Sequence, residues 1–272
     1  MPELTQLLPM LALLLVIGAF AGVIAGLLGV GGGIILVPAF FYTFSALGYA
    51  SAQLMQVSLA TSLATIVVTS TRSVLAHHRR GAVNWDILRT WGAGIVIGAV
   101  LGVLVASALR SQVLQGIFGV LGLIVGLYLG FGRADRRLGA TMPVGRLRGA
   151  LSPALGFLSV LMGIGGGSFG VPLMGLYGLT IHRAVATASG FGLLIALPST
   201  IGFLRLNVDG APPFSYGAVN APAFLVVITM TLITTPWGVR LAHATDPKPL
   251  KRIFAVFITL VALNMLRKAV GW

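Results

Sequence analysis

The sequence predicts an all-α polytopic membrane protein with two inverted repeats, each a glycine-broken helical hairpin plus three transmembrane helices, giving about 8–10 membrane segments. Three observations predict this class. Of the 272 residues, 57% are hydrophobic and only 8% are charged, whereas a soluble domain has about a quarter of its residues charged. Several apolar runs approach or exceed the roughly 18 residues that a spanning helix needs. A glycine-rich motif also occurs twice.

Apolar runs bounded by glycine, proline or charged residues predict ten helical segments. They span residues 7–28, 34–47, 54–76, 86–107, 112–131, 147–162, 168–180, 184–205, 220–242 and 251–270. The segments 34–47 and 168–180 are too short to cross a hydrocarbon core of about 30 Å, because a helix rises about 1.5 Å per residue. Each directly follows a glycine cluster. We therefore predict that each forms half of a broken or re-entrant hairpin.

The two glycine clusters are copies of one another. The stretch 27–38 begins LLGVGGG and ends in Val-Pro, and the stretch 161–172 begins LMGIGGG and also ends in Val-Pro. Downstream, LQGIFGV at 114–120 parallels LKRIFAV at 250–256. Such internal duplication indicates repeated structural units.

The duplication predicts a first repeat at 1–132, a basic cytoplasmic linker at 133–148 and a second repeat at 149–272. Each repeat contains five segments. Because five is an odd number, the second repeat is inverted relative to the first. Inverted repeats with interrupted short helices in matching positions are typical of secondary transporters.

Most Lys and Arg residues lie in three gaps between the apolar runs, at 77–89, 132–148 and 240–252. Loops rich in these residues stay in the cytoplasm. We therefore expect an integral protein of the cell inner (plasma) membrane, with the main basic loops cytoplasmic and both termini outside. This topology accounts for the net charge of +13 without a nucleic-acid partner. No basic residue precedes the first apolar run, so we expect no cleaved signal peptide.

The glycine clusters are the first candidate site. A helix restarts after each cluster, at Ile34 and at Ser168, and the free N–H groups and dipole of a helix start favour an anion. Inverted symmetry would bring the two starts toward one point near the midplane. The alternative is that the glycines only allow close helix packing. Neither cluster fits G-x-G-x-x-G or a P-loop, which disfavours nucleotide binding.

The third segment carries one polar stripe at helical spacing. The stripe consists of Ser58, Ser62, Thr65, Thr69, Arg72 and Ser73. Membrane-helix hydroxyls can instead bond back to their own helix. Arg72 lies about a turn inside the inner boundary, where a charge is usually functional, although it can also snorkel to the surface. In the matching helix, Arg205 at the outer end is a candidate for an outer gate or an anchor.

Weaker candidates for gating or coupling are His77 and His182, both at predicted cytoplasmic helix ends, where solvated histidines are the default. No carboxylate lies in the middle of a predicted span. Without cysteine there is no disulfide, thiolate metal site or nucleophilic thiol. We expect no catalytic residue, no metal and no cofactor.

The paired motif resembles the sulfite exporter TauE/SafE family of membrane permeases. The resemblance rests on AGLLGVGGG at 25–33 and GIGGG at 163–167, each followed by Val-Pro, with support from Ala-Thr-Ser at 60–62 and Ala-Thr-Ala-Ser at 186–189. It spans essentially the whole chain. It implies export of sulfite or small organosulfonates, whereas the residues alone indicate only a small anion.

We therefore predict a secondary transporter that exports small sulfur-containing anions by alternating access, and not an enzyme. Its partners are the anionic substrate and the lipid bilayer, and the oligomeric state stays open. The predicted substrate-binding residues are Gly31, Gly32, Gly33, Thr61, Ser62, Arg72, Gly165, Gly166, Gly167, Ser168, Thr187 and Ser189. An anion channel or a permease for another small anion is the alternative. An intramembrane hydrolase built on Ser189 is disfavoured, because no histidine lies at that depth.

Overall fold

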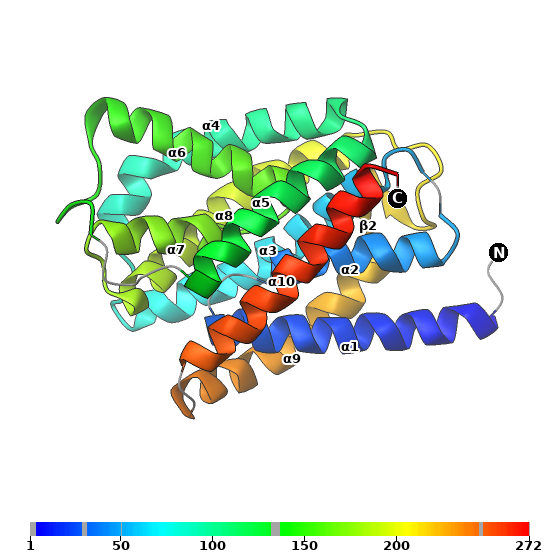
Figure 1. Cartoon of the computed structure of the whole chain (residues 1–272), viewed down its shortest axis with the longest axis horizontal. Coiled ribbons are helices and arrows are strands. Elements are labelled where there is room, and N and C mark those ends of the chain that lie inside the picture. The colour runs from blue at the N-terminus through cyan, green and yellow to red at the C-terminus, as the bar shows by residue number, and fades with distance from the viewer. Residues whose placement is uncertain (1–3, 29–31, 50, 132–136, 245–246, 272) are drawn as a thin grey trace.

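A computed structural model describes residues 4–28, 32–49, 51–131, 137–244 and 247–271 (Figure 1). Within these ranges the side chains of 4–10, 25–28, 239, 242–244 and 247–251 are not described. Ten helices and one two-stranded hairpin occupy the described ranges: α1 (Leu4–Leu28), α2 (Gly33–Ala46), α3 (Leu54–Arg79), α4 (Trp85–Ala108), α5 (Ser111–Phe131), α6 (Gly145–Leu161), α7 (Gly167–Leu176), α8 (Ile181–Leu204), β1 (Ser215–Tyr216), β2 (Val219–Asn220), α9 (Ala221–Ala244) and α10 (Pro247–Ala269). The ten predicted helices and the all-α membrane class are thus confirmed, and only the hairpin was not foreseen.

Five of the described helices are long and apolar enough to cross a membrane: α3, α4, α5, α8 and residues 221–238 of α9. The two short helices are also as predicted. α2 has 14 residues and α7 has 10, so they reach only about 21 Å and about 15 Å at the helical rise. Each begins one residue earlier than expected, at Gly33 and Gly167.

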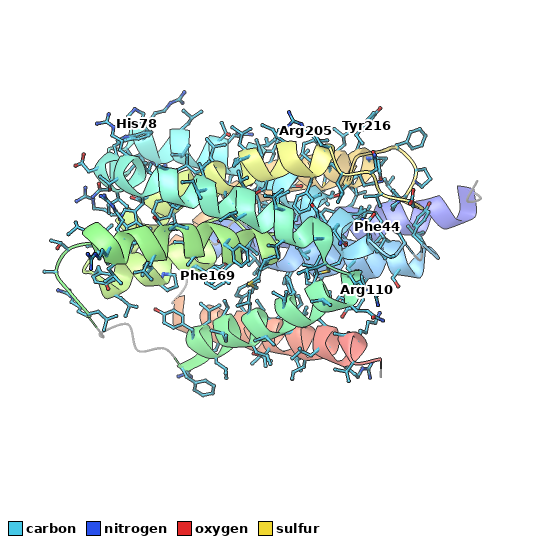
Figure 2. All side chains as sticks on the ribbon, turned by 90° about the horizontal axis from the view of Figure 1, so that it is seen from above. Phe44, His78, Arg110, Phe169, Arg205 and Tyr216 are labelled. Atoms are coloured by element: carbon cyan, nitrogen blue, oxygen red, sulfur yellow. The ribbon has the colours of Figure 1, made fainter. Side chains whose placement is uncertain are left out.

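The centre of the bundle is the pair α3 and α8, which pack against each other. α2 and α9 lie against α3, while α7 and α4 lie against α8. α1 pairs with α9 and α6 pairs with α4, and Figure 2 shows α5 and α10 side by side along one side of the bundle. Exchanging α1–α5 with α6–α10 leaves these pairings unchanged. Two inverted repeats would produce this pattern; the repeat boundaries stay a prediction.

The helix pairs α1–α9 and α4–α6, which we call the outer pairs, pack through glycines at matching positions. A Cβ on Gly22 of α1 would lie 2.8 Å from the Cα of Thr231 in α9, and a Cβ on Gly156 of α6 would overlap the carbonyl of Ile95 in α4. Small residues let helix backbones approach closely in membranes. The packing explanation therefore holds for these glycines of the outer pairs.

The bundle has a basic end, where α3 and α9 end and α4, α6 and α8 begin. Cationic side chains gather there on several elements: His77, His78, Arg79, Arg80, Arg89, Arg146, Arg148, His182, Arg183 and Arg240. In Figure 2, His78 lies toward this end, whereas Arg110 and Tyr216 lie toward the other. α1 begins and α10 ends at the opposite end (Figure 1).

Candidate functional site

The two glycine segments meet in the middle of the bundle. Gly32 has φ 64° and directly precedes α2, while Gly163 has φ 60° between α6 and α7. A Cβ on Gly33 would lie 2.7 Å from the Gly163 carbonyl oxygen and 2.9 Å from the Cα of Ile164. The convergence expected from the sequence is therefore present between residues 32–33 and 163–164. Gly31 lies outside the described residues.

α3 holds the second glycine segment in place. The Ser62 hydroxyl donates a hydrogen bond of 2.8 Å to the Gly163 carbonyl oxygen, and both groups are buried. A Cβ on Gly163 would clash with Val37 of α2 and with Leu59 of α3, at 2.6 Å and 2.8 Å. Only glycine combines this close approach with a positive φ. Ser62 thus acts on the break in the chain and not on an open cavity.

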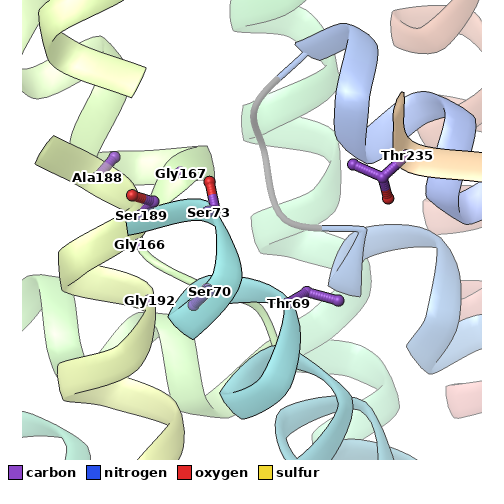
Figure 3. Close-up of a pocket in the computed structure, with 10 residues that line it drawn as sticks. Thr69, Ser70, Ser73, Gly166, Gly167, Ala188, Ser189, Gly192 and Thr235 are labelled. Carbon is purple, nitrogen blue, oxygen red and sulfur yellow. The ribbon is translucent and has the colours of Figure 1, made fainter. Parts of the chain in front are cut away.

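A cavity of about 60 Å³ lies beside the start of α7 (Figure 3). Its ten described lining residues come from α3, the second glycine segment, α8 and α9: Thr69, Ser70, Ser73, Gly165, Gly166, Gly167, Ala188, Ser189, Gly192 and Thr235. We call this cavity the hydroxyl pocket. Figure 3 shows Thr235 of α9 on the opposite side of the pocket from Ser189 and Gly166.

The hydroxyl pocket lies between the basic end and the middle of the helices. Its lining residues on α3, from Ser73 to Thr69, lie six to ten residues before Arg79, and those on α8, from Ala188 to Gly192, lie seven to eleven residues after Ile181. At the helical rise these separations are about 9–15 Å and about 11–17 Å. The pocket therefore extends from about a third to about half of the way into a hydrocarbon core of about 30 Å.

Hydrogen-bond donors converge on the hydroxyl pocket. Ser70 is only 7% exposed and lines the pocket, and its hydroxyl makes no hydrogen bond within the described chain. The backbone amides of Gly165, Gly166 and Gly167 also lack a partner among the described residues, as the first amides of a helix do. Buried donors without partners are rare in folded proteins. A ligand with acceptor oxygens would satisfy them.

The space between these donors exists because residue 192 is glycine. A Cβ on Gly192 would overlap the Ser70 hydroxyl and would lie 3.6 Å from the Gly166 amide nitrogen. Gly192 therefore keeps open the gap that Ser70 and Gly166 border. Ser168, one residue beyond the lining, has a buried hydroxyl that lacks a partner within the described chain.

Three of the other pocket hydroxyls are acceptors, and the fourth, that of Ser73, makes no hydrogen bond within the described chain. Thr69, Ser189 and Thr235 donate their protons to carbonyl oxygens of their own helices, at Thr65, Ala186 and Thr231 respectively. The alternative in which stripe hydroxyls bond back to their own helix holds for Ser58, Thr65 and Thr69, and Thr61 beside the stripe does the same. A hydroxyl so engaged still offers its lone pairs to the pocket. The pocket therefore offers both hydrogen-bond donors and hydrogen-bond acceptors to a ligand.

Thr61 and Thr187 lie outside the pocket lining and hold two helix starts instead. Thr61 accepts a hydrogen bond of 3.0 Å from the amide of Asn220 before α9, and Thr187 accepts one of 3.0 Å from the amide of Asn84 before α4. Both asparagines also cap their helices, with side-chain oxygens accepting from Ala223 and Ile87. Both capped starts follow the same four residues, Gly-Ala-Val-Asn at 81–84 and at 217–220. The sequence analysis did not recognise this repeat.

The charged candidates also lie outside the pocket lining. Arg72 and Arg205 have exposed side chains, and Arg205 follows the last residue of α8. His182 is exposed and His77 is partly exposed, both at the basic end. The exposure of Arg72 matches the alternative in which this side chain snorkels to the surface.

Of the predicted binding residues, Gly165, Gly166, Gly167 and Ser189 line the pocket. Thr69 and Ser73 were recognised as part of the polar stripe but not as binding residues. The sequence analysis missed Ser70, Gly192 and Thr235 as members of the site. Ser70 lies beside the stripe, and the only signal at Gly192 is a cluster of small residues, Ser-Gly-Phe-Gly at 189–192. The meeting of α3, α8 and α9 is what brings these residues together.

A bundle of apolar helices with two short helices that begin at glycine segments, the second bordering a pocket with five hydroxyl side chains, defines a polytopic integral membrane protein of the transporter type. The family described as sulfite exporter TauE/SafE matches residues 14–265. The chain belongs to this family.

Relatives of known name agree with the class. A probable membrane transporter protein of Haemophilus influenzae is 29% identical over 94% of this chain and 98% of its own length. One of Methanocaldococcus jannaschii is 26% identical over 96% of this chain and 97% of its own. The probable membrane transporter protein ORF9 of Sinorhizobium sp. is 30% identical over 94% and 92%. The chain is thus a membrane transporter. No solved structure matches it.

Proposed function

We propose that the chain is a secondary transporter that exports small sulfur-containing anions, sulfite or organosulfonates, by alternating access around the hydroxyl pocket. One observation carries the site: the unpartnered donors of Ser70 and of residues 165–167 converge on a buried cavity of about 60 Å³. The positive end of the α7 dipole lies at the same point. The sulfur-containing substrate comes from the family description.

The inverted repeat supports alternating access. In transporters with such repeats, one bundle rocks against the other around a fixed site. Here the halves 1–132 and 149–272 exchange equivalent contacts: Thr61 holds the start of α9, and Thr187 holds the start of α4. The two halves thus contact each other through matched hydrogen bonds toward opposite ends of the bundle, since Thr61 lies seven residues after the start of α3 and Thr187 six residues after the start of α8.

The proposed orientation places the basic end in the cytoplasm of the inner membrane, with both termini outside. The cationic side chains of the basic end then face the cytoplasm and raise the local concentration of anions on that side of the pocket. An inside-negative potential favours the exit of an anion by about 2.3 kcal/mol per charge at 100 mV. Export therefore requires no dedicated proton site.

Flux in proteoliposomes tests this function. We expect saturable movement of sulfite or methanesulfonate that a membrane potential drives and that unlabelled anion on the far side accelerates, with chloride as the control anion. Counterflow of this kind distinguishes a carrier from a channel. Flat traces for both anions would contradict the proposed substrate, and conductance without counterflow would contradict the carrier mechanism.

A matched pair of variants locates the transport site. Gly192→Ala places a methyl group between Ser70 and Gly166 and should abolish flux. Gly175→Ala, in α7, meets nothing within 4 Å and should leave flux unchanged. Equal flux in the two variants would place transport elsewhere in the molecule.

A further inference from the structure

We infer that the hydroxyl pocket binds a singly charged oxyanion and rejects dianions such as sulfate and fully deprotonated sulfite. This inference rests on the proposed function and names the charge state of its substrate.

The first argument is the charge of the pocket. None of the ten described lining residues carries a charged side chain, and α7 contains no ionisable residue. The nearest charges on the other helices that form the pocket are Arg72 and His77 on α3, His182 and Arg183 on α8, and Arg240 on α9. Arg72, His182, Arg183 and Arg240 are exposed, and His77 lies one turn beyond Ser73. A bound anion would therefore be balanced by dipoles and hydroxyls alone.

Dipoles of this size match one charge better than two. The start of a helix acts as about half a positive charge, and the pocket adds neutral donors from Ser70 and residues 165–167. The cost of taking an ion out of water rises with the square of its charge, so a dianion costs about four times as much to bury as a monoanion of equal size. Among the described residues one helix start, that of α7, faces the pocket, and half a positive charge cannot offset that difference.

The second argument is the arrangement of acceptors. Thr69, Ser189 and Thr235 have committed their protons to helix carbonyls, so their oxygens face the pocket as acceptors. Figure 3 shows Thr235 across the pocket from the donor side. Sulfate has acceptor oxygens on every side, and deprotonated sulfite has no proton to donate, so either dianion would set lone pairs against these acceptors. Bisulfite keeps one proton that it can donate to these acceptor oxygens. A sulfonate can place its apolar group on the acceptor side of the pocket.

The third argument is volume. A buried water needs about 10–15 Å³ of such space, so a cavity of about 60 Å³ holds one compact anion and no accompanying cation. A counter-ion that neutralised a second charge would therefore have to lie outside this volume.

Binding to the purified full-length protein tests this inference without relying on transport. Titration calorimetry would measure the Kd of sulfite at about pH 6 and about pH 8, since sulfite passes from its monoanion to its dianion over this interval. Methanesulfonate, singly charged at both values, serves as the control, and sulfate is the dianion at both. We expect the Kd of sulfite to rise about sevenfold at the higher pH, in line with the loss of its monoanion. Methanesulfonate should bind equally at both pH values and sulfate should not compete.

Two variants tie the result to the pocket. Ser70→Ala removes a donor and should weaken methanesulfonate binding about tenfold or more, as loss of a hydrogen bond to a charged group does. Ser58→Ala, a buried α3 serine bonded back to Leu54 and outside the pocket lining, should leave binding unchanged.

Each other outcome overturns the inference. Competition by sulfate equal to that of methanesulfonate, or sulfite binding that is equal or tighter at the higher pH, would contradict the single charge while leaving the proposed function intact. Absence of binding by both sulfite and methanesulfonate at both pH values would remove the proposed function and this inference together. Unchanged binding in Ser70→Ala would place the anion outside this pocket.

Discussion

The hydroxyl of Thr61 accepts a hydrogen bond of 3.0 Å from the backbone amide of Asn220, and so the central helix α3 holds the start of α9. Thr61 itself donates to the Val57 carbonyl at 2.7 Å, which leaves its lone pairs for the amide. Both residues are buried. Without the hydroxyl, the Asn220 amide would be buried without a partner.

Thr61→Val should therefore destabilise the protein by about 1–3 kcal/mol, the cost of an unsatisfied buried donor. Thr61→Ser retains the hydroxyl and should recover most of that loss. Thermal unfolding in detergent would measure the difference between the two variants. Equal stability of Val and Ser at this position would show that the hydrogen bond contributes nothing.

The equivalent contact in the other half predicts a smaller effect. Thr187→Val should cost less than Thr61→Val, because Thr187 accepts the Asn84 amide at the same 3.0 Å but this contact is only partly buried. The double variant should cost about the sum, since the two bonds lie on different helices and share no group. A strongly sub-additive double variant would mean that the two contacts act as one unit.

Gly33→Ala should separate the two glycine segments. The added Cβ would meet the Gly163 carbonyl oxygen and the Cα of Ile164, at 2.7 Å and 2.9 Å. Both are backbone atoms, so no side chain can rotate away, and overpacking of this kind typically costs about 1–3 kcal/mol. Gly175→Ala, which meets open space, is the matched control. Yield of folded protein and thermal unfolding would report the effect, and a Gly33→Ala protein as stable as the control would contradict the tight contact.

Arg72→Gln should leave anion affinity within about twofold of the parent, because its side chain is exposed and lies outside the pocket lining. A long Arg side chain that extends to the membrane surface has its charge screened by water and salt. Calorimetry with methanesulfonate measures this directly. A tenfold loss of affinity would return Arg72 to the site, as the sequence analysis placed it.

The sequence predicted the fold better than the site, for physical reasons. The length of an apolar run and the glycines that bound it are local properties of the sequence. All ten helices, including the two short ones, could therefore be predicted from them. The role of Thr61 could not, because its partner Asn220 is 159 residues away. Ser70 and Gly192 likewise have no distinguishing local pattern. They form a pocket only because α3 and α8 cross there.

The glycine clusters show the same limit. The pattern predicts that the two helix starts, at residues 34 and 168, converge. In the structure Gly33 at the start of α2 meets Gly163 and Ile164, which precede α7. Of the two starts, that of α7 alone borders the pocket within the described residues. The difference lies in one side chain, Ile66 of α3. Its Cδ1 would lie 2.9 Å from a Cβ on Gly33, and its Cγ2 would lie 3.2 Å from a Cβ on Gly165. Ile66 is fully buried, and it fills the space between the two glycine segments.

Ile66→Ala should therefore enlarge the pocket toward the first glycine segment. Removing this side chain should cost about 2–5 kcal/mol of stability, as large-to-small changes in cores do. It should also admit longer sulfonates: we expect ethanesulfonate and propanesulfonate to gain affinity relative to methanesulfonate. Ile66→Val, which removes one methyl group and typically costs about 0.5–1.5 kcal/mol, should change selectivity little. Calorimetry of the three sulfonates on both variants measures this. Unchanged ratios in Ile66→Ala would show that Ile66 does not bound the space that the anion occupies, and that another side chain sets its length.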